Sequence, residues 1–307
     1  AIDAAYAIGY TLAVTHPQAG NLGGGGFMVV YDANKHETVA LDYREKAPLA
    51  AHKDLFLLEN GTVSKTKSRF SALSIGVPGT VLGLETAHQR YGRLDRKILL
   101  DYAIQLAEKG FVVQDDLEIA LKRYKVNLEN HQATKAVFFK GDTLYKTGDI
   151  LKQPALAKTL KRIKKHGSKD FYHGKIAKQL VRYIKSKGGI ITKDDLKQYH
   201  PVWRDVVTGE YKNLRIASMP PPSSGGIALI QSLNILNHFD IRKMGHNSVE
   251  TMHIISDTLK YVYSDRARYL GDTDFVDVPT EKLISKTYAK TIANKISTQN
   301  IVNSDDV

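Results

Sequence analysis

Apolar residues recur along this chain with two different periods, and the change between them outlines the fold. A period of three to four residues covers 2–15 and most of 78–200, which is typical of amphipathic helices. Short runs rich in Val, Phe, Tyr and Ile predict strands at about 26–31 and 37–42, joined by the polar turn "DANKHE", and at about 202–211 and 214–218. Few strands among many helices predict an α+β or α/β fold.

Several residues mark where the predicted helices begin and end. Gly92 and Gly110 follow two helical stretches, as C-terminal caps do, and Thr192 and Asp195 have the spacing of an N-terminal capping box. The segment "AVFFKGDTLY" predicts a small hairpin. Further helices are predicted at about 114–130, 154–166, 174–187 and 280–296, after Ser223 or Ser224, and from Asn247 or Ser248 onward.

No internal repeat, low-complexity segment or linker interrupts the 307 residues. We therefore expect a single domain over 1–307, with an N-terminal helix and core-sheet strands in 1–48, a mainly helical region in 78–200, and strands and C-terminal helices in 201–307. No run of eighteen apolar residues occurs, so no membrane-spanning helix is expected. The sequence opens within a helical pattern, and we expect it to be a piece of a longer protein.

The net charge of +12 has two explanations. The lysines of "ALAKTLKRIKKHG" and "KIAKQLVRYIKSKGG" alternate with apolar residues at helical spacing, which indicates the solvated faces of amphipathic helices. The alternative is that an acidic partner segment is absent from this chain. No zinc-finger or aromatic–basic RNA motif accompanies the lysines, so nucleic-acid binding is not expected.

The four consecutive glycines of "GNLGGGGFMVVYD", Gly23 to Gly26, raise the question of a nucleotide site. A P-loop ends in Gly-Lys-Ser/Thr, and a dinucleotide fold places G-x-G-x-x-G between a strand and a following helix. Here the glycines follow a predicted helix and precede a predicted strand, which is the reverse order. Close packing of the backbone against another segment is the better interpretation.

Arg44, in "ALDYREKAP", lies where a predicted strand gives way to a loop. A guanidinium at that place can hold a carboxylate through two charge-assisted hydrogen bonds. It can equally pair with a neighbouring acid such as Asp42 or Glu45, and the spacing alone favours that simpler interpretation.

The chain carries no recognisable nucleophile with its base. It has no cysteine, no H-E-x-x-H and no G-x-S-x-G, and its eleven histidines are scattered singly. A metal site, a cofactor and a disulfide are therefore not expected. In "MPPPSSGG", Ser223 and Ser224 are more simply helix caps than part of an anion site at the helix N-terminus.

Five segments taken in order resemble the γ-glutamyltranspeptidase family, in particular the large subunit of its bacterial members. They are "AIDAAYAIGYTLAVTHPQAGNLGGGGFMVVYD", "LDYREKAPLAA", "VPGTVLGLETAHQRYG", "MPPPSSGG" and "SDRARYLGDTDFVDVPTEKLISKTYA". The resemblance implies an N-terminal-nucleophile hydrolase with a four-layer αββα sandwich, completed by a separate small subunit cut from the same precursor. The nucleophile is then the N-terminal threonine of that small subunit, expected beyond Val307, and no catalytic residue is expected in this chain.

The resemblance also implies a substrate and a role for one residue. Family members cleave the γ-glutamyl amide of glutathione and pass the glutamyl group to water, an amino acid or a dipeptide. The family's D-x-R-E-x-A-P stretch matches at Asp42, Arg44, Glu45, Ala47 and Pro48, which makes Arg44 the group that binds the α-carboxylate of the substrate. Periplasmic or secreted localisation is implied in the same way.

Two alternatives stay open at this point. A cephalosporin acylase or a poly-γ-glutamate depolymerase of the same superfamily shares the architecture and the self-cleavage, and the second of these retains the arginine as well. A non-catalytic protein that binds anionic polymers on the same scaffold is the other alternative.

Overall fold

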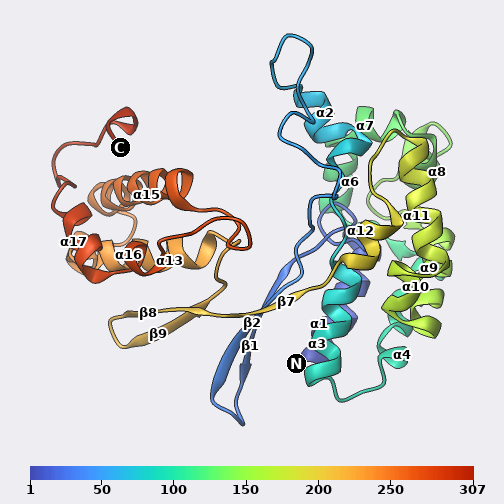
Figure 1. The fold of residues 1–307 in the computed structure, drawn as a ribbon, viewed down its shortest axis with the longest axis horizontal. Coiled ribbons are helices and arrows are strands. Elements are labelled where there is room, and N and C mark those ends of the chain that lie inside the picture. Colours follow the sequence, from blue (N-terminus) through green and yellow to red (C-terminus); the bar gives the residue numbers. More distant parts are fainter. The chain divides into compact units, whose positions relative to one another are not determined.

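The computed structural model describes residues 1–307, which separate into two compact units. Unit 1 comprises residues 1–26 and 42–202, and unit 2 comprises residues 27–41 and 203–307. Figure 1 shows helices and strands in both units, so the predicted α+β class is confirmed. The single domain over 1–307 stays a prediction.

Unit 1 is mainly helical. Its strands are short antiparallel pairs, β3 (Phe111–Val112) with β6 (Ile150–Leu151) and β4 (Phe139–Lys140) with β5 (Thr143–Leu144). Its helices, with one 3-10 turn (η1, Ala72–Ser74), are α1 (Ile2–Thr15), α2 (Lys65–Phe70), α3 (Thr80–Tyr91), α4 (Arg96–Leu99), α5 (Asp101–Lys109), α6 (Asp115–Arg123), α7 (Lys125–Glu129), α8 (Gln132–Phe138), α9 (Pro154–His166), α10 (Ser168–Tyr172), α11 (Lys175–Ser186) and α12 (Lys193–Gln198).

The strongest helical patterns of unit 1 are confirmed. Helix α1 has the predicted bounds and buries Tyr6 and Tyr10 as it packs against α3 and α5. Helices α9 and α11 match the predicted 154–166 and 174–187 within a residue. Thr192 and Asp195 form the predicted capping box of α12. The helices and the capping box depend on contacts between residues three or four positions apart. The spacing of residues in the sequence fixes such contacts directly.

Longer predicted helices are interrupted where tertiary packing requires a turn. The predicted helix 114–130 breaks at Tyr124, whose φ of −103° and ψ of 13° end α6. The break lets Leu128 of α7 pack on the same core cluster as Leu117 and Leu121 of α6. The stretch before Gly110 divides likewise into α4 and α5, and α2, α8 and α10 were not predicted.

The two glycine caps of unit 1 differ from each other. Gly110 has a φ of 94°, the left-handed side that glycine adopts at helix C-termini. Gly92 also ends its helix, and its N–H donates to the carbonyl of His88 (2.7 Å), but its φ of −68° and ψ of 150° are those of extended backbone and not of a left-handed cap.

Unit 2 holds the larger strands. Strands β1 (Phe27–Asp32), β2 (Glu37–Asp42) and β7 (Val202–Asp205) form one sheet in the order β1-β2-β7. Strands β8 (Val207–Tyr211) and β9 (Leu214–Ser218) form an antiparallel hairpin, with Val207 opposite Ser218. The predicted strand 202–211 is therefore divided between two sheets, and β7 begins at the last residue of unit 1.

The helices of unit 2 pack around a core of Ile235, Ile254, Val262 and Ile292. Helix α13 contacts β8, α15 and α17 (Figure 1). The helices, with one 3-10 turn (η2, Ser304–Asp306), are α13 (Gly225–Leu236), α14 (Ile241–Met244), α15 (Val249–Tyr269), α16 (Thr280–Leu283) and α17 (Lys286–Ala293), so the predicted helix 280–296 is two helices. None of the helices in either unit combines the length and the apolar character that crossing a bilayer requires.

One predicted cap of unit 2 is confirmed and another is corrected. The Ser248 hydroxyl accepts the Thr251 N–H (3.1 Å) and caps α15 as predicted. Ser224 occupies the N-cap position of α13, but its side chain does not cap the helix. Its hydroxyl accepts a hydrogen bond from Arg266 Nε (3.0 Å), because α15 brings that guanidinium to the start of α13.

A buried carboxylate anchors the C-terminal segment within unit 2. Asp257 of α15 is fully buried and accepts hydrogen bonds from the Val302 N–H (3.0 Å) and from Lys260 Nζ (2.9 Å), with His253 Nε2 at 3.1 Å. Burial opposes ionisation of this group, but the hydrogen bonds from Val302 and Lys260 outweigh burial, and the pKa of Asp257 is lowered.

We predict that Asp257→Asn loosens the segment around Val302. Loss of the charged acceptor increases amide hydrogen exchange at Val302 about tenfold or more at pH 7, measured by mass spectrometry. The lowered pKa means that the ionised group stabilises the fold above the ordinary Asp pKa of about 4, and this contribution is lost as the pH falls through the folded-state value. The difference between variant and wild type therefore shrinks in acid. Asp305→Asn, at an exposed position of the same segment, is the control, and equal exchange in the two variants at pH 7 contradicts the assignment.

Candidate functional site

Arg44 lies two residues beyond the end of β2, in a loop segment that runs to Leu49. Its backbone N–H donates to Oδ1 of Asp42 (3.0 Å), the buried last residue of the strand. The residue itself is exposed. The strand end and the aspartate thus fix the backbone from which the guanidinium extends.

Helix α12, more than 140 residues further along the chain, holds this segment at two points. The Tyr199 hydroxyl donates to the carbonyl oxygen of Arg44 (2.9 Å). Oδ1 of Asp195 accepts the N–H of Leu49 (2.6 Å), while Oδ2 of the same carboxylate accepts the N–H and hydroxyl of Thr192 in the capping box. One aspartate therefore caps α12 and ties the Arg44 segment to it.

A third attachment comes from the segment before α3. The N–H of Val77 donates to the carbonyl of Lys46 (2.7 Å), and the N–H of Lys46 donates to the carbonyl of Val77 (3.2 Å). This reciprocal pair is a single bridge of antiparallel sheet. The backbone between Arg44 and Leu49 is thus hydrogen-bonded on both sides.

The groups that hold the segment stay in their hydrogen-bonding states across the physiological range. Tyr199 is buried and its ring stacks on Tyr172, with centroids 5.7 Å apart and planes at 14°. Burial raises the pKa of Tyr199 far above its ordinary value, so the hydroxyl remains a donor. Burial opposes ionisation of Asp195 too, but the hydrogen bonds from Thr192 and Leu49 keep its pKa below the ordinary value, so it remains an acceptor.

The glycine run packs against the same segment, which confirms the packing interpretation. A Cβ on Gly25 would lie 2.6 Å from the Tyr43 oxygen and 2.7 Å from the Glu45 nitrogen, closer than real Cβ atoms approach. Gly26 and Tyr43 exchange two backbone hydrogen bonds (3.0 and 3.2 Å), and the Gly24 carbonyl accepts the N–H of Gly79 (2.8 Å). Gly25 and Gly26 thus pack closely against the backbone and ring of the segment from Tyr43 to Glu45.

Gly79 also packs closely against this segment. A Cβ there would overlap the Tyr43 carbonyl oxygen and the Tyr199 hydroxyl. The first turn of α3 can approach both groups only because this residue has no side chain. Tyr43, between Gly25 and Gly79, is thereby held as firmly as Arg44 beside it.

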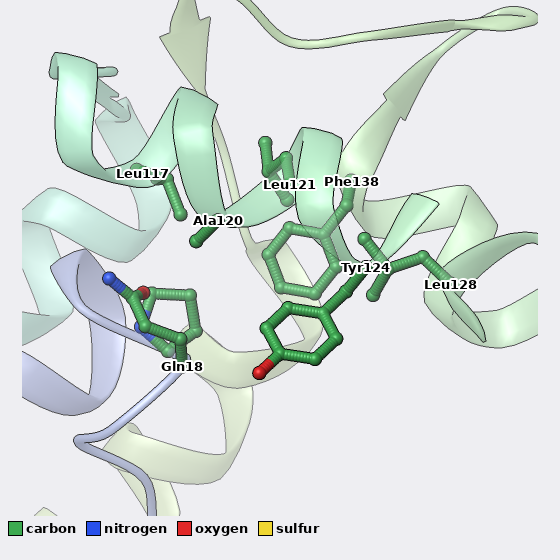
Figure 2. A pocket seen from close by; sticks show the side chains of 8 residues that line it. Gln18, Leu117, Ala120, Leu121, Tyr124, Leu128 and Phe138 are labelled. Carbon is green, nitrogen blue, oxygen red and sulfur yellow. The ribbon is translucent and has the colours of Figure 1, made fainter. Parts of the chain in front are cut away.

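The cavities of unit 1 do not enclose a substrate beside Arg44. A cavity of about 140 Å³ lies along the anchored segment, between Lys46, Leu49, Asp195 and Tyr199, and is too small for a tripeptide. A second, of about 240 Å³, is lined mainly by apolar side chains from α6, α7 and α8 (Figure 2). No charged side chain lines that second cavity, so it offers nothing to bind a carboxylate.

The remaining candidate groups take up structural roles. The Ser223 hydroxyl accepts the Gly225 N–H (3.3 Å) at the start of α13. No group of three or more His, Cys, Asp or Glu side chains in residues 1–307 is arranged to hold a metal ion.

Sequence reasoning identified Arg44 but missed the residues that hold it. Asp195 was recognised only as a helix cap, and Tyr199 was not singled out at all. Each is separated from its partner by about 150 residues, 146 for Asp195 with Leu49 and 155 for Tyr199 with Arg44. No periodicity or short motif connects positions so far apart.

Comparison with known proteins finds relatives that match nearly the whole of this chain. The family model for γ-glutamyltranspeptidase matches residues 1–306. The chain is 48% identical over 297 residues to the glutathione hydrolase proenzyme of Escherichia coli, which covers 96% of this chain and 51% of that protein. It thus spans about half the length of the curated relatives it matches.

Solved structures give the same result. The γ-glutamyltranspeptidase of Helicobacter pylori superposes with a TM-score of 0.97 at 45% identity, covering 100% of this chain and 88% of that one. A cephalosporin acylase from Bacillus halodurans superposes with a TM-score of 0.84 at 25% identity, covering 97% of this chain and 55% of that one. With a family model that matches all but the last residue, this chain belongs to the γ-glutamyltranspeptidase family.

Proposed function

We propose that this chain is the large subunit of an enzyme that cleaves the γ-glutamyl amide bond of glutathione and related compounds. The enzyme passes the glutamyl group to water, as a hydrolase, or to an amino acid or dipeptide, as a transferase. The observation that supports this most is Arg44, which matches the family's substrate-binding stretch and stands on a backbone fastened by Asp42, Tyr199 and the bridge at Lys46.

In the proposed mechanism, Arg44 binds the α-carboxylate of the γ-glutamyl group through charge-assisted hydrogen bonds. A guanidinium on an immobile backbone fixes one end of the substrate, so the γ-amide at the other end is presented in one position. This is a binding and orienting role, and the large subunit takes no part in proton transfer.

The chemical steps belong to the proposed small subunit. The hydroxyl of its N-terminal threonine attacks the γ-carbonyl carbon while its α-amine accepts the proton, directly or through water. The C–N bond breaks, the leaving amine takes that proton, and the glutamyl group remains as an ester on the threonine. Water or an acceptor amine then attacks the ester and releases the threonine. No metal or cofactor enters this scheme.

We propose further that residues 1–307 act as one domain once the small subunit is bound and the four-layer sandwich is complete. Strand β1 is an edge of its sheet and carries two exposed apolar side chains, Val29 and Tyr31. An unpaired edge with apolar side chains is a surface that partner strands cover. By family likeness, the assembled enzyme is exported to the periplasm or secreted.

The competing function is that of an acylase on the same fold, and the cephalosporin acylase match is the observation that supports it. The test is to co-express the chain with its downstream sequence and to assay glutamate release from glutathione, beside a variant of the first downstream threonine. Activity that disappears together with precursor cleavage in the variant supports the proposal. Cleavage of the precursor without glutathione turnover favours the acylase.

Arg44→Ala is expected to raise the KM for a γ-glutamyl anilide about thirtyfold or more, because a charge-assisted pair with the α-carboxylate is lost. Precursor cleavage continues, since no substrate carboxylate takes part in it. Arg44→Lys, which keeps the charge but not the two-pronged geometry, gives an intermediate KM. An unchanged KM in Arg44→Ala shows that another group binds the carboxylate.

Tyr199→Phe is expected to raise the same KM about fivefold with little change in kcat. It removes one hydrogen bond, worth about 1 kcal/mol, that fixes the Arg44 carbonyl. Tyr183→Phe, an identical change at an exposed position of α11, is the control.

Tyr199 affects substrate binding only by positioning Arg44. In an Arg44→Ala background, Tyr199→Phe should add nothing to KM. A donor whose α-carboxylate is replaced by an amide should not distinguish the Tyr199 variant from wild type. Additive effects in the double variant count against the positioning role.

A further inference from the structure

The net positive charge of this protein is concentrated in one short segment. Residues 152–187 contain twelve lysines and arginines and a single acidic residue, Asp170. The rest of the chain contains 32 basic and 31 acidic residues, so the segment carries +11 of the net charge of +12. The chain outside this segment is nearly neutral.

The fold directs these charges outward. The segment forms α9, α10 and α11, and α10 packs against both of the other helices (Figure 1). Helix α9 buries Ala157, Leu160 and Ile163, and α11 buries Ile176 and Ile184. With the apolar faces committed to the core, the lysines lie on the solvent side of each helix.

Three of the twelve cations have acidic partners. Arg162 forms a two-pronged pair with Asp170 (2.7 and 2.8 Å), Lys161 pairs with Glu108, and Lys164 pairs with Asp101. The other nine are exposed and have no carboxylate within 4 Å, and we call them the basic face: Lys152, Lys158, Lys165, Lys169, Lys175, Lys178, Arg182, Lys185 and Lys187.

The basic face carries an internal repulsion. On α11, Lys175, Lys178, Arg182 and Lys185 follow one another at three- and four-residue spacing, so their side chains are neighbours along the helix. Like charges at this spacing destabilise a helix. An anionic surface laid against the face lowers that repulsion, because its charges attract the lysines and the arginine of α11.

We propose that the basic face binds the assembled protein to the surface of an anionic lipid bilayer. Clusters of four to eight lysines and arginines on an amphipathic helix are typical of such binding. Eight of the nine groups are lysines, whose compact ammonium suits a diffuse layer of headgroups, whereas arginine suits individual phosphates. The binding is peripheral and reversible, with no part of the chain inserted.

The shape of the face argues against other polyanions. The apolar cavity between α6, α7 and α8 contains no residue of the basic face. A further cavity of unit 1, of about 450 Å³ beside Arg69 and Tyr183, contains only Lys187 of the face, so neither forms a groove along the face for a nucleic-acid strand. The only exposed aromatic residue of α11 is Tyr183, and Lys187 lies over its ring (5.8 Å), which leaves no stacking platform for bases. A protein interface would need apolar anchors at its centre, and α9 and α11 expose no large aliphatic side chain.

The test is co-sedimentation of the assembled two-subunit protein with large vesicles. Phosphatidylcholine vesicles with and without 30% phosphatidylglycerol (roughly the anionic content that gives a strongly negative surface) are compared at low and high salt. We expect binding only to the anionic vesicles and only at low salt. Lys175→Gln/Lys178→Gln/Arg182→Gln should weaken it about a hundredfold, since each charge near such a surface contributes about fivefold.

The matched control removes the same charge elsewhere. Lys53→Gln/Lys65→Gln/Lys109→Gln changes three exposed lysines outside the segment and should retain nearly all of the binding. Equal loss in the two triple variants overturns the proposal, because net charge and not the face would then decide. So does an absence of vesicle binding at low salt, or tighter binding of a duplex or single-stranded oligonucleotide than of the anionic vesicles. Unchanged thermal unfolding and glutathione turnover in the variants keep the comparison free of folding effects.

Discussion

The close approach of three backbone segments around Tyr43 is the constraint on which the Arg44 region depends. Gly25 lies against Tyr43 and Glu45, Gly79 lies against the carbonyl of Tyr43, and neither contact leaves room for a Cβ. Without side chains between them, the backbones come close enough to form hydrogen bonds. The N–H of Gly79, for example, donates to the carbonyl of Gly24. The result is a rigid base at the end of β2, since backbone atoms have far fewer alternative positions than side chains.

This base matters for Arg44, because a guanidinium can be oriented precisely only if the backbone that carries it is fixed. The arginine side chain is long and flexible. A fixed backbone keeps backbone motion from adding to the motion of the side chain. The Tyr199 hydroxyl and the Asp42 carboxylate fix the carbonyl and the N–H of the residue. The supporting groups are buried while the arginine is exposed, so strong hydrogen bonds and access for a substrate are combined in one segment.

Acidic and basic side chains have different surroundings in this protein. Buried carboxylates such as Asp195 and Asp257 accept several hydrogen bonds each, and their lowered pKa values reflect that saturation. Apart from Lys161 and Lys164, which pair with Glu108 and Asp101, the lysines of α9 and α11 lack carboxylate partners and stay in solvent. The first arrangement fixes segments of chain that are distant in sequence. The second concentrates the net positive charge in residues 152–187, while the rest of the chain is nearly neutral.

The sequence by itself determined many of the local elements and the family, and it singled out Arg44 as a candidate site residue. The bounds of α1 and α9, the capping box of Thr192 and Asp195, and the packing role of the glycines follow from spacing over a few residues, where the physical rules are local. Arg44 emerged only through likeness to a family, because an arginine after a strand has simpler explanations.

Only the tertiary structure decided which distant groups meet. The contact of Tyr199 with Arg44 joins positions 155 residues apart, and the turn at Tyr124 exists because Leu128 must reach the cluster around Leu117. For the same reason, the Ser224 hydroxyl accepts a hydrogen bond from Arg266 Nε and not from the N–H groups of its own helix. These choices depend on three-dimensional neighbours, about which periodicity and capping rules carry no information.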